Sequence, residues 1–239
     1  MYFDRGNGPL LTILLPSRHR FEMLSHTIDT FIDKAKDPKN IEIILKIDQD
    51  DTETIKRLPE LRNDALIKTI ISPRLNGYAS LHDYSNQMVK IATGDWVLFT
   101  NDDSTMETES WDSILENISP SEDFEGSKNV ACVRFNCLWR NKDQITSIGK
   151  NEFPAIRRSV CQSLGYFALQ THVDSFIHLI YDQLNANIFT ELSINHYKND
   201  IDDSINKQTT TAARSTSAAF FPFMEQNLAV FVKHHKKLI

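Results

Sequence analysis

The sequence is poor in cysteine, in net positive charge and in long apolar runs. Its three cysteines, Cys132, Cys137 and Cys161, do not have the CxxC spacing of a metal site, and so sparse a set favours a reduced, intracellular compartment. The formal charge of −6 argues against a nucleic-acid-binding protein, which would carry a clustered basic face. We therefore expect neither a cysteine-bound metal nor a nucleic-acid partner.

No apolar segment predicts a membrane span. The run at residues 10–15 is far shorter than the roughly 20 residues of a transmembrane helix, and its surroundings lack the layout of a signal peptide. We expect a soluble, cytoplasmic protein with no transmembrane segment. The basic end KHHKKLI leaves open a peripheral membrane contact, although cations also suit the end of a carboxy-terminal helix.

The pattern of apolar residues predicts an α/β protein. Hydrophobic and charged residues make up 41% and 24% of the 239-residue chain, which suits one domain with a sizeable core. Apolar runs typical of buried strands occupy residues 10–16, 41–47, 66–72 and 96–99. Helical spacing recurs between the first two runs and between the last two. This alternation predicts a mostly parallel sheet with helices on both faces.

The second half of the chain is less regular. The elements expected there are a strand at 129–139, a strand running into a short helix at 153–165, a helix at 173–184 and a late strand at 187–197. The polar segment 202–219 is predicted to be a mobile loop. Residues 220–238 resume the helical spacing, and their apolar face must pack on the rest of the protein.

Polar clusters follow three of the predicted strands: PSRHR after the first, DQDD after the second and NDDS after the fourth. In parallel sheets, ligands bind beyond the carboxyl ends of the strands, so we expect the clusters to lie together. Mg²⁺ and Mn²⁺ bind through one or two carboxylates plus substrate phosphates, which is one interpretation of Asp102 and Asp103. The alternative is that Asp102 and Ser104 cap a helix leading to Trp111.

Three segments resemble a family-2-type glycosyltransferase with the GT-A fold. They are ILLPSRHRFEMLSHTIDTFI, IEIILKIDQDD and NGYASLHDYSNQMVKIATGDWVLFTNDD, and the likeness extends over about two-thirds of the chain in order and spacing. It implies a Rossmann-like catalytic domain at 1–200, in which residues 1–105 bind the nucleotide sugar and residues 106–200 the acceptor. Residues 201–239 would add a flexible loop and a terminal helix packed on the same domain.

The resemblance also implies roles for residues on the nucleotide side. Pro16, Ser17 and Arg18 would form the loop beside the nucleoside. Either Asp48 or Asp51 would contact the base, because the acidic pair that usually follows the second strand is displaced in this sequence.

The family's DxD-type motif implies a divalent metal, Mn²⁺ or Mg²⁺, held by Asp103. Asp102 would contact the ribose or a metal-bound water, and His196 resembles a late histidine that joins the metal or diphosphate site in many GT-A enzymes. Asn101 departs from the pattern, since the first position of the motif is usually an aspartate. The metal would act as a Lewis acid on the leaving nucleoside diphosphate.

The family's inverting chemistry implies a general base near the acceptor hydroxyl, and the matching residue is Asp174 at the start of a helix. Arg158 and Gly165 would lie in the segment that shapes the acceptor pocket. His172 is a second candidate base. The alternative role of Asp174 is to stabilise the first turn of its helix through the helix dipole.

The sequence thus predicts a metal-dependent, hexosyltransferase-type enzyme. It would move a sugar from a nucleotide-diphospho-sugar, with UDP as the family's expected nucleotide, to a glycan or another hydroxyl-bearing acceptor. Asn101 keeps a non-catalytic nucleotide- or glycan-binding relative as an alternative. A sugar nucleotidyltransferase would need a Gly-rich loop, and PSRHRFEM has no glycine. A phospho-acceptor signalling domain would leave the last hundred residues or so unexplained.

Overall fold

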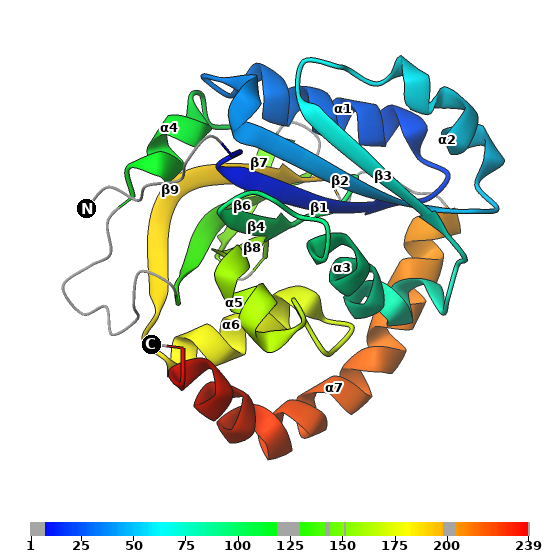
Figure 1. Ribbon diagram of the computed structural model, residues 1–239. Helices are drawn as coiled ribbons and strands as arrows, with labels where there is room; N and C mark the ends of the chain where they lie inside the picture. The colour runs from blue at the N-terminus through cyan, green and yellow to red at the C-terminus, as the bar shows by residue number, and fades with distance from the viewer. Residues whose placement is uncertain (1–7, 119–129, 142–143, 151, 198–203, 239) are drawn as a thin grey trace.

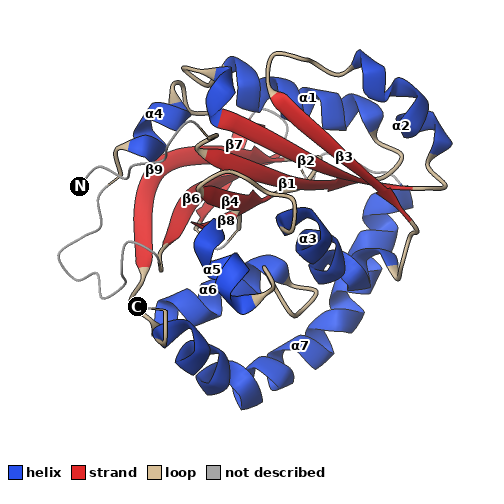
Figure 2. Ribbon diagram, in the orientation of Figure 1, coloured by secondary structure: helices blue, strands red, loops and turns tan. Residues whose placement is uncertain are grey.

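The computed structural model describes residues 8–118, 130–141, 144–150, 152–197 and 204–238, and one curved sheet runs through it with helices on both faces (Figures 1 and 2). The strands are β1 (Leu11–Ser17), β2 (Ile41–Asp48), β3 (Leu66–Ser72), β4 (Trp96–Phe99), β5 (Ser104–Met106), β6 (Cys132–Asn141), β7 (Gln144–Gly149), β8 (Pro154–Arg157) and β9 (Asn187–His196). They are ordered β3-β2-β1-β4-β8-β6-β9-β5, and β7 pairs with β6.

The two faces of the sheet carry different numbers of helices. They are α1 (Phe21–Asp33), α2 (Thr52–Arg57), α3 (Leu81–Val89), α4 (Trp111–Glu116), α5 (Arg158–Leu164), α6 (Val173–Gln183) and α7 (Ser204–Lys236), with short 3-10 turns η1 (Pro38–Asn40), η2 (Leu58–Glu60) and η3 (Gly77–Ser80). Helices α1 and α2 lie on one face, whereas α3, α5, α6 and α7 lie on the other (Figure 1). The predicted α/β class is confirmed.

The sheet is mixed. Strands β3, β2, β1 and β4 are parallel, as predicted for the first half of the chain. In the second half, β8 runs antiparallel to both β4 and β6, and β7 antiparallel to β6. Antiparallel strands need only short connections, whereas a parallel pair needs a crossover of a dozen residues or more. The short links between β6, β7 and β8 therefore explain the change of direction.

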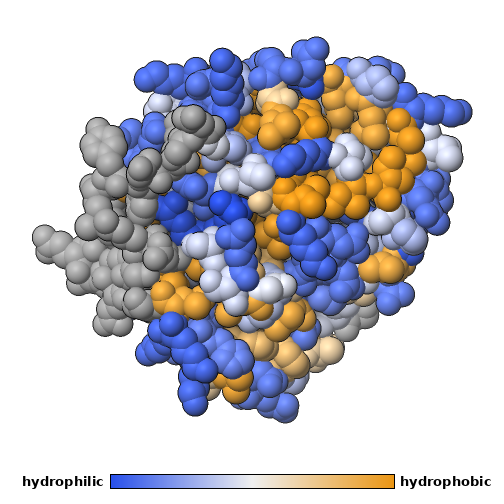
Figure 3. All heavy atoms as spheres, viewed as in Figure 1, coloured by the Kyte–Doolittle hydropathy of each residue, from blue (hydrophilic) through white to orange (hydrophobic). Residues whose placement is uncertain are grey.

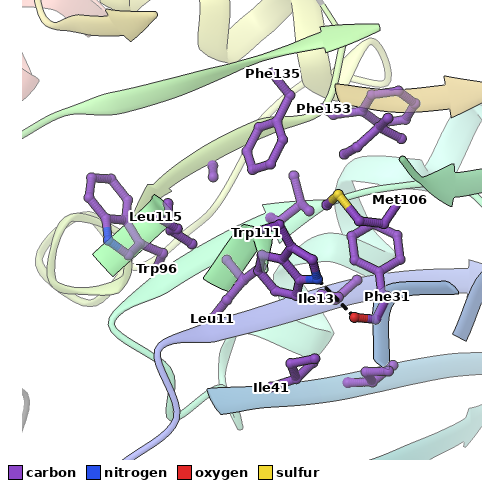
Figure 4. Packing of buried hydrophobic residues seen from close by; sticks show 14 of the residues in the cluster. Leu11, Ile13, Phe31, Ile41, Trp96, Met106, Trp111, Leu115, Phe135 and Phe153 are labelled. Carbon is purple, nitrogen blue, oxygen red and sulfur yellow. Dashed lines mark hydrogen bonds between the residues drawn. The ribbon is translucent and has the colours of Figure 1, made fainter. Parts of the chain in front are cut away.

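Two apolar clusters hold the layers together. Because successive side chains of a strand point to opposite faces, Ile13 of β1 joins one cluster and Leu14 the other. On the α1 side, Phe31 packs edge-to-face on Trp111 with ring centroids 5.9 Å apart, and Trp111 Nε1 donates to the Phe31 carbonyl at 2.8 Å (Figure 4). This contact anchors α4 to α1.

Helix α7 corrects the loop predicted at 202–219. It is helical from Ser204, while the first residues of the expected loop lie outside the described part of the chain. The segment from Ser204 to Phe221 contains neither glycine nor proline, so nothing in its backbone chemistry stops a helix. The end of α7 packs on α6, where the rings of Phe176 and Phe231 lie 5.1 Å apart.

Edge strand β3 is the most apolar part of the surface shown in Figure 3, where hydrophobic side chains gather along it. Leu66, Ile71 and nearby Leu75 are each close to half exposed. Within the described residues, no helix combines the length and the apolar character needed to cross a bilayer.

Candidate functional site

A pocket of about 280 Å³ opens at the carboxyl ends of β1, β2 and β4. Its lining combines the loop after β1, the end of β2, the segment after β4, the start of α6 and the end of β9. The predicted site residues found in the lining are Pro16, Ser17, Arg18, Asp48, Asp102, Asp103, Asp174 and His196. The three polar clusters therefore meet, as the parallel arrangement of β1, β2 and β4 requires.

Asp48, the last residue of β2, lies beside three cations, of which two donate hydrogen bonds and the third, Arg74, has its Nε 3.9 Å from Oδ2. Arg18 Nη1 donates to Asp48 Oδ2 at 2.9 Å, and its guanidinium also pairs with exposed Asp50. Lys46, buried within β2, donates to Asp48 Oδ1 and lies 4.1 Å from the centroid of the Tyr84 ring. Hydrogen bonding to Arg18 lowers the pKa of Asp50 to about 2. This side of the pocket presents a fixed carboxylate that Arg18 and Lys46 hold in place.

Asp102 and Asp103 follow β4 and are each only 7% exposed. Ser17 Oγ donates to Asp102 Oδ2 at 2.7 Å, and Arg20 Nη1 donates to Asp102 Oδ1 at 3.2 Å. Burial and the neighbouring Asp103 charge raise the pKa of Asp102 to about 6, against the opposing effects of Arg20 and Ser17. Ser104 begins a strand and Ser110 precedes α4, so Asp102 and Ser104 do not cap the helix at Trp111.

Asp103 meets His196 because β5 pairs with β9. Ser104 lies opposite His196 in that antiparallel pair, and Tyr197 N donates to the Asp103 carbonyl at 3.0 Å. His196 Nε2 lies 3.2 Å from Asp103 Oδ1 and 3.5 Å from Asn101 Nδ2. The ring of Trp139 packs on His196 with centroids 4.7 Å apart and planes tilted by 39°, which limits rotation of the imidazole.

The Asp103–His196 pair fits a divalent metal that also takes substrate oxygens. Among the described residues, no group of three or more His, Cys, Asp or Glu side chains could hold a metal. However, Mg²⁺ and its relatives usually bind through one or two protein side chains plus phosphates and waters. Two neighbouring ligands at about 2.1 Å from one cation lie about 3 Å apart. The observed separation of 3.2 Å between Asp103 Oδ1 and His196 Nε2 agrees with that spacing.

Asp174 lines the far side of the pocket, in the first turn of α6. Its Oδ1 accepts from Ser175 N at 2.7 Å, which is a local first-turn contact. Tyr78 lines the same side, and burial together with the Asp174 charge raises the pKa of that phenol to about 12. His172, the second candidate base, is instead held by α7, because Thr216 Oγ1 and Ser217 Oγ each lie 3.1 Å from its Nε2.

Four predicted site residues lie outside the pocket lining: His172, Gly165 at the end of α5, Asp51 and Arg158. Asp51 is fully buried and caps α2, accepting from Thr54 N at 3.2 Å and from His19 N at 2.7 Å. Arg158 Nε donates to the Gly94 carbonyl at 2.8 Å, beside the start of β4. That is the opposite end of β4 from Asp102. These contacts argue against a substrate-binding role for Asp51 or Arg158.

Sequence reasoning missed several lining residues, which include Arg20, Lys46, Arg74, Tyr78, Trp139, Glu152 and Phe153. Lys46 had a signal, because a lysine inside the apolar run IEIILKI must find a buried partner. Arg20 belonged to the PSRHR cluster, which pointed to the correct loop. Trp139 and Glu152 carried no such signal, since only the fold of β6 to β8 brings them to the pocket.

The family model described as Glycosyl transferase family 2 matches residues 12–173. No curated protein sequence matches this chain.

Solved structures with similar folds include a mannosyltransferase and S. aureus TarS. Mannosyltransferase PcManGT from Pyrobaculum calidifontis, in complex with GDP-Man and Mn²⁺, matches 98% of this chain and 75% of its own, with a TM-score of 0.60 and 14% identity. S. aureus TarS 1-349 in complex with UDP matches 78% of this chain with a TM-score of 0.59 and 12% identity, and this chain spans 60% of its length. TarS 1-349 in complex with UDP-GlcNAc gives a TM-score of 0.56 at 13% identity, over 78% of this chain and 58% of its own.

Proposed function

Because the chain belongs to glycosyl transferase family 2, we propose that it transfers a sugar from a nucleoside-diphosphate donor to an acceptor hydroxyl, with inversion at the anomeric carbon. Its fold is the GT-A fold. The observation that carries the proposal is the convergence of Asp48, Asp102, Asp103, Asp174 and His196 on one pocket at the carboxyl ends of the parallel strands. Residues far apart in the sequence thereby form two sides of one site.

The nucleoside is assigned to the side of the pocket between Ser17 and Asp48. Asp48 accepts hydrogen bonds and is held by Arg18 and Lys46, so it can receive a base N–H or a ribose hydroxyl without moving. Asp102, which Ser17 and Arg20 hold in the pocket lining, is assigned to the ribose. UDP and GDP are the nucleotides to test first, because the similar structures contain UDP, UDP-GlcNAc and GDP-Man.

Asp103 and His196 are the residues that would hold Mn²⁺ or Mg²⁺. When bound there, the metal supplies Lewis-acid stabilisation of the leaving diphosphate, which is worth several kcal/mol. The similar mannosyltransferase structure contains Mn²⁺ together with GDP-Man, which supports a divalent metal as cofactor.

Asp174 is assigned as the general base. Its carboxylate would take the proton of the acceptor hydroxyl while the hydroxyl oxygen forms a bond to the anomeric carbon. The bond between that carbon and the diphosphate oxygen breaks on the opposite side, and its electron pair leaves with the nucleoside diphosphate. A base placed in this way contributes about 10²–10⁴-fold in rate.

Ligand-dependent thermal stability tests this assignment. Titration of UDP and GDP, with and without Mn²⁺, should raise the midpoint of unfolding for at least one nucleotide. Ligand at about a hundred times its Kd adds about 2.7 kcal/mol, which corresponds to about 5–10 °C in a chain of this size. Asp103→Ala should abolish the metal-dependent part of the shift. Asp64→Ala is the control, because Asp64 pairs with Arg62 on the exposed surface, away from the pocket.

Catalysis is separated from simple binding by following the donor. A non-catalytic relative would show the same shift but would leave UDP-GlcNAc and GDP-Man intact in the presence of any acceptor. The assignment is overturned if no nucleotide stabilises the protein with Mn²⁺, or if Asp103→Ala keeps the full shift.

A further inference from the structure

Arg20 places a guanidinium against both carboxylates of the Asp102–Asp103 pair. It lies in the loop between β1 and α1, lines the pocket, and its side chain is 9% exposed. A single nitrogen serves both partners, since Nη1 lies 3.2 Å from Asp102 Oδ1 and 3.6 Å from Asp103 Oδ2. The opposite side of Asp102 is held by Ser17 Oγ at 2.7 Å. The Arg20 guanidinium is therefore a positive charge that lies beside Asp102 and Asp103 even without a bound metal.

Asp103 uses its two oxygens on different partners. Oδ2 faces Arg20, whereas Oδ1 lies 3.2 Å from His196 Nε2. A cation held by Asp103 and His196 would thus share one carboxylate with the Arg20 guanidinium. Like charges that share one carboxylate repel each other, and burial of the site strengthens this repulsion.

The charge of the cluster depends on Arg20. Two ionised carboxylates and one guanidinium leave one negative charge, and a divalent cation would convert this into one positive charge, which attracts a diphosphate. Without Arg20, the same cation would only neutralise the two carboxylates. The cluster would then carry no net charge, and it would attract the diphosphate less strongly, through the metal's own coordination alone.

We propose that Arg20 is a resident cation of the donor site, which weakens the binding of free metal at Asp103 and strengthens the binding of the diphosphate that accompanies it. This inference rests on the proposed function, because it assigns the metal to Asp103 and His196. Arg20 acts here as a specificity-determining residue that makes the site prefer a metal together with a diphosphate over the metal alone.

The test is the pair of affinities in Arg20→Gln, measured by calorimetry at pH 7.5 with Mn²⁺ alone and with UDP. Removal of the guanidinium should tighten Mn²⁺ binding about tenfold, because one repelling charge is lost. UDP binding, with or without saturating Mn²⁺, should weaken about tenfold, because one attracting charge is lost. A purely structural role of Arg20 would instead weaken both ligands together.

Two controls sharpen the measurement. Arg62→Gln removes another arginine that pairs with two aspartates, Asp33 and Asp64, on the surface, and it should change neither affinity. Arg20→Lys keeps a positive charge, and since one nitrogen serves both carboxylates, each affinity should stay within about threefold of the wild-type value.

Loss of the Arg20 charge beside two buried carboxylates could prevent Arg20→Gln from folding. The comparison is then made between Asp102→Asn and the double variant Arg20→Gln/Asp102→Asn. The single variant keeps the charges of Arg20 and Asp103, whereas the double variant keeps only the charge of Asp103. The double variant should bind Mn²⁺ about tenfold more tightly and UDP more weakly than Asp102→Asn.

The inference is overturned if wild-type protein binds Mn²⁺ and UDP but loss of Arg20 leaves Mn²⁺ binding unchanged or weaker. Absence of both Mn²⁺ and UDP binding in the wild-type protein would instead overturn the proposed function, and this inference with it.

Discussion

At the scale of single residues, position relative to the end of β2 separates the tasks of two nearby aspartates. Asp48 is the last residue of the strand and lines the pocket, whereas Asp51 precedes α2 and caps it. The three-residue offset is enough to turn one carboxylate toward the pocket and the other into the protein. Asp51 also accepts from His19 N at 2.7 Å, which is a second contact to the backbone rather than to the pocket.

Substitution of each aspartate should therefore give a different result. Asp48→Asn should weaken UDP binding about tenfold, because a hydrogen bond to an ionised acceptor is worth about 1.5–3 kcal/mol. Asp51→Ala should lower the free energy of unfolding by about 1–2 kcal/mol through loss of the helix cap. Its UDP affinity should stay within about threefold of wild type. Denaturant titration and calorimetry check both results, and loss of UDP binding in Asp51→Ala at unchanged stability would reverse the assignment.

Asp174 has two roles to be separated, general base and first-turn acid. Asp174→Asn should keep the Mn²⁺-dependent thermal shift with UDP but lower kcat about 10²–10⁴-fold. The matched control is Asp83→Asn, which removes an exposed first-turn acid from α3 and should cost only about 0.3–1 kcal/mol of stability. Turnover that is equal in both variants would exclude Asp174 as the base.

At the scale of elements, the sequence predicted the strands that are long apolar runs. It missed the strand that is recognisable only by its pairing with another strand. Strands β1, β2 and β4 were readable because each is an apolar run, and the parallel arrangement then placed their polar ends together. Strand β5 could not be recognised in the sequence, since its three residues, Ser-Thr-Met, are too few to show a hydrophobic periodicity. Yet its pairing with β9 is what brings Asp103 to His196.

For a related reason, the sequence could not decide whether Asp48 or Asp51 lies at the pocket. The answer depends on where β2 ends and on α2, a six-residue helix too short to show an amphipathic pattern. Helix α7 was misjudged for the opposite reason, because polar composition was taken as a sign of a loop. Helices stabilised by tertiary packing need an apolar face in only part of their length.

The packing of α7 is tested by two adjacent phenylalanines. Phe220 is 2% exposed and packs on His172 with ring centroids 5.1 Å apart, whereas Phe221 is 59% exposed. Phe220→Ala should lower the free energy of unfolding by about 3–5 kcal/mol. Phe221→Ala should change it by less than about 0.5 kcal/mol. Equal effects in denaturant titrations would show that α7 does not pack as described.

At the scale of the whole molecule, buried titratable groups on the α6–α7 side set the pH dependence of stability. Burial and nearby Arg134 lower the pKa of His178 well below its usual 6.5, and burial lowers that of His235. The unfolded chain takes up protons at both residues below about pH 6.5, and the folded protein resists this uptake. Their contribution is therefore complete above pH 6.5 and is lost as the pH falls toward the lowered pKa values.

Asp102 acts in the opposite direction. Its pKa is raised to about 6 by burial and by Asp103, so its contribution to stability is complete below the usual value of 3.8 and is lost as the pH rises through 6. Each group contributes at most about 1.4 kcal/mol per pH unit. With two histidines against one carboxyl, the metal-free protein should become less stable as the pH falls from 6.5.

The variant His178→Leu isolates one of these contributions. It keeps a buried side chain on α6 but cannot take up a proton, so the free energy of unfolding should fall less steeply between pH 6.5 and 5, by up to about 1.4 kcal/mol per pH unit. His26→Leu, at an exposed position of α1, should keep the wild-type slope. Denaturant titrations at half-unit pH steps give both slopes. A His178→Leu slope equal to that of wild type would mean that the folded protein protonates His178 as readily as the unfolded chain does. The acid sensitivity would then have to arise outside the layer formed by α6 and α7.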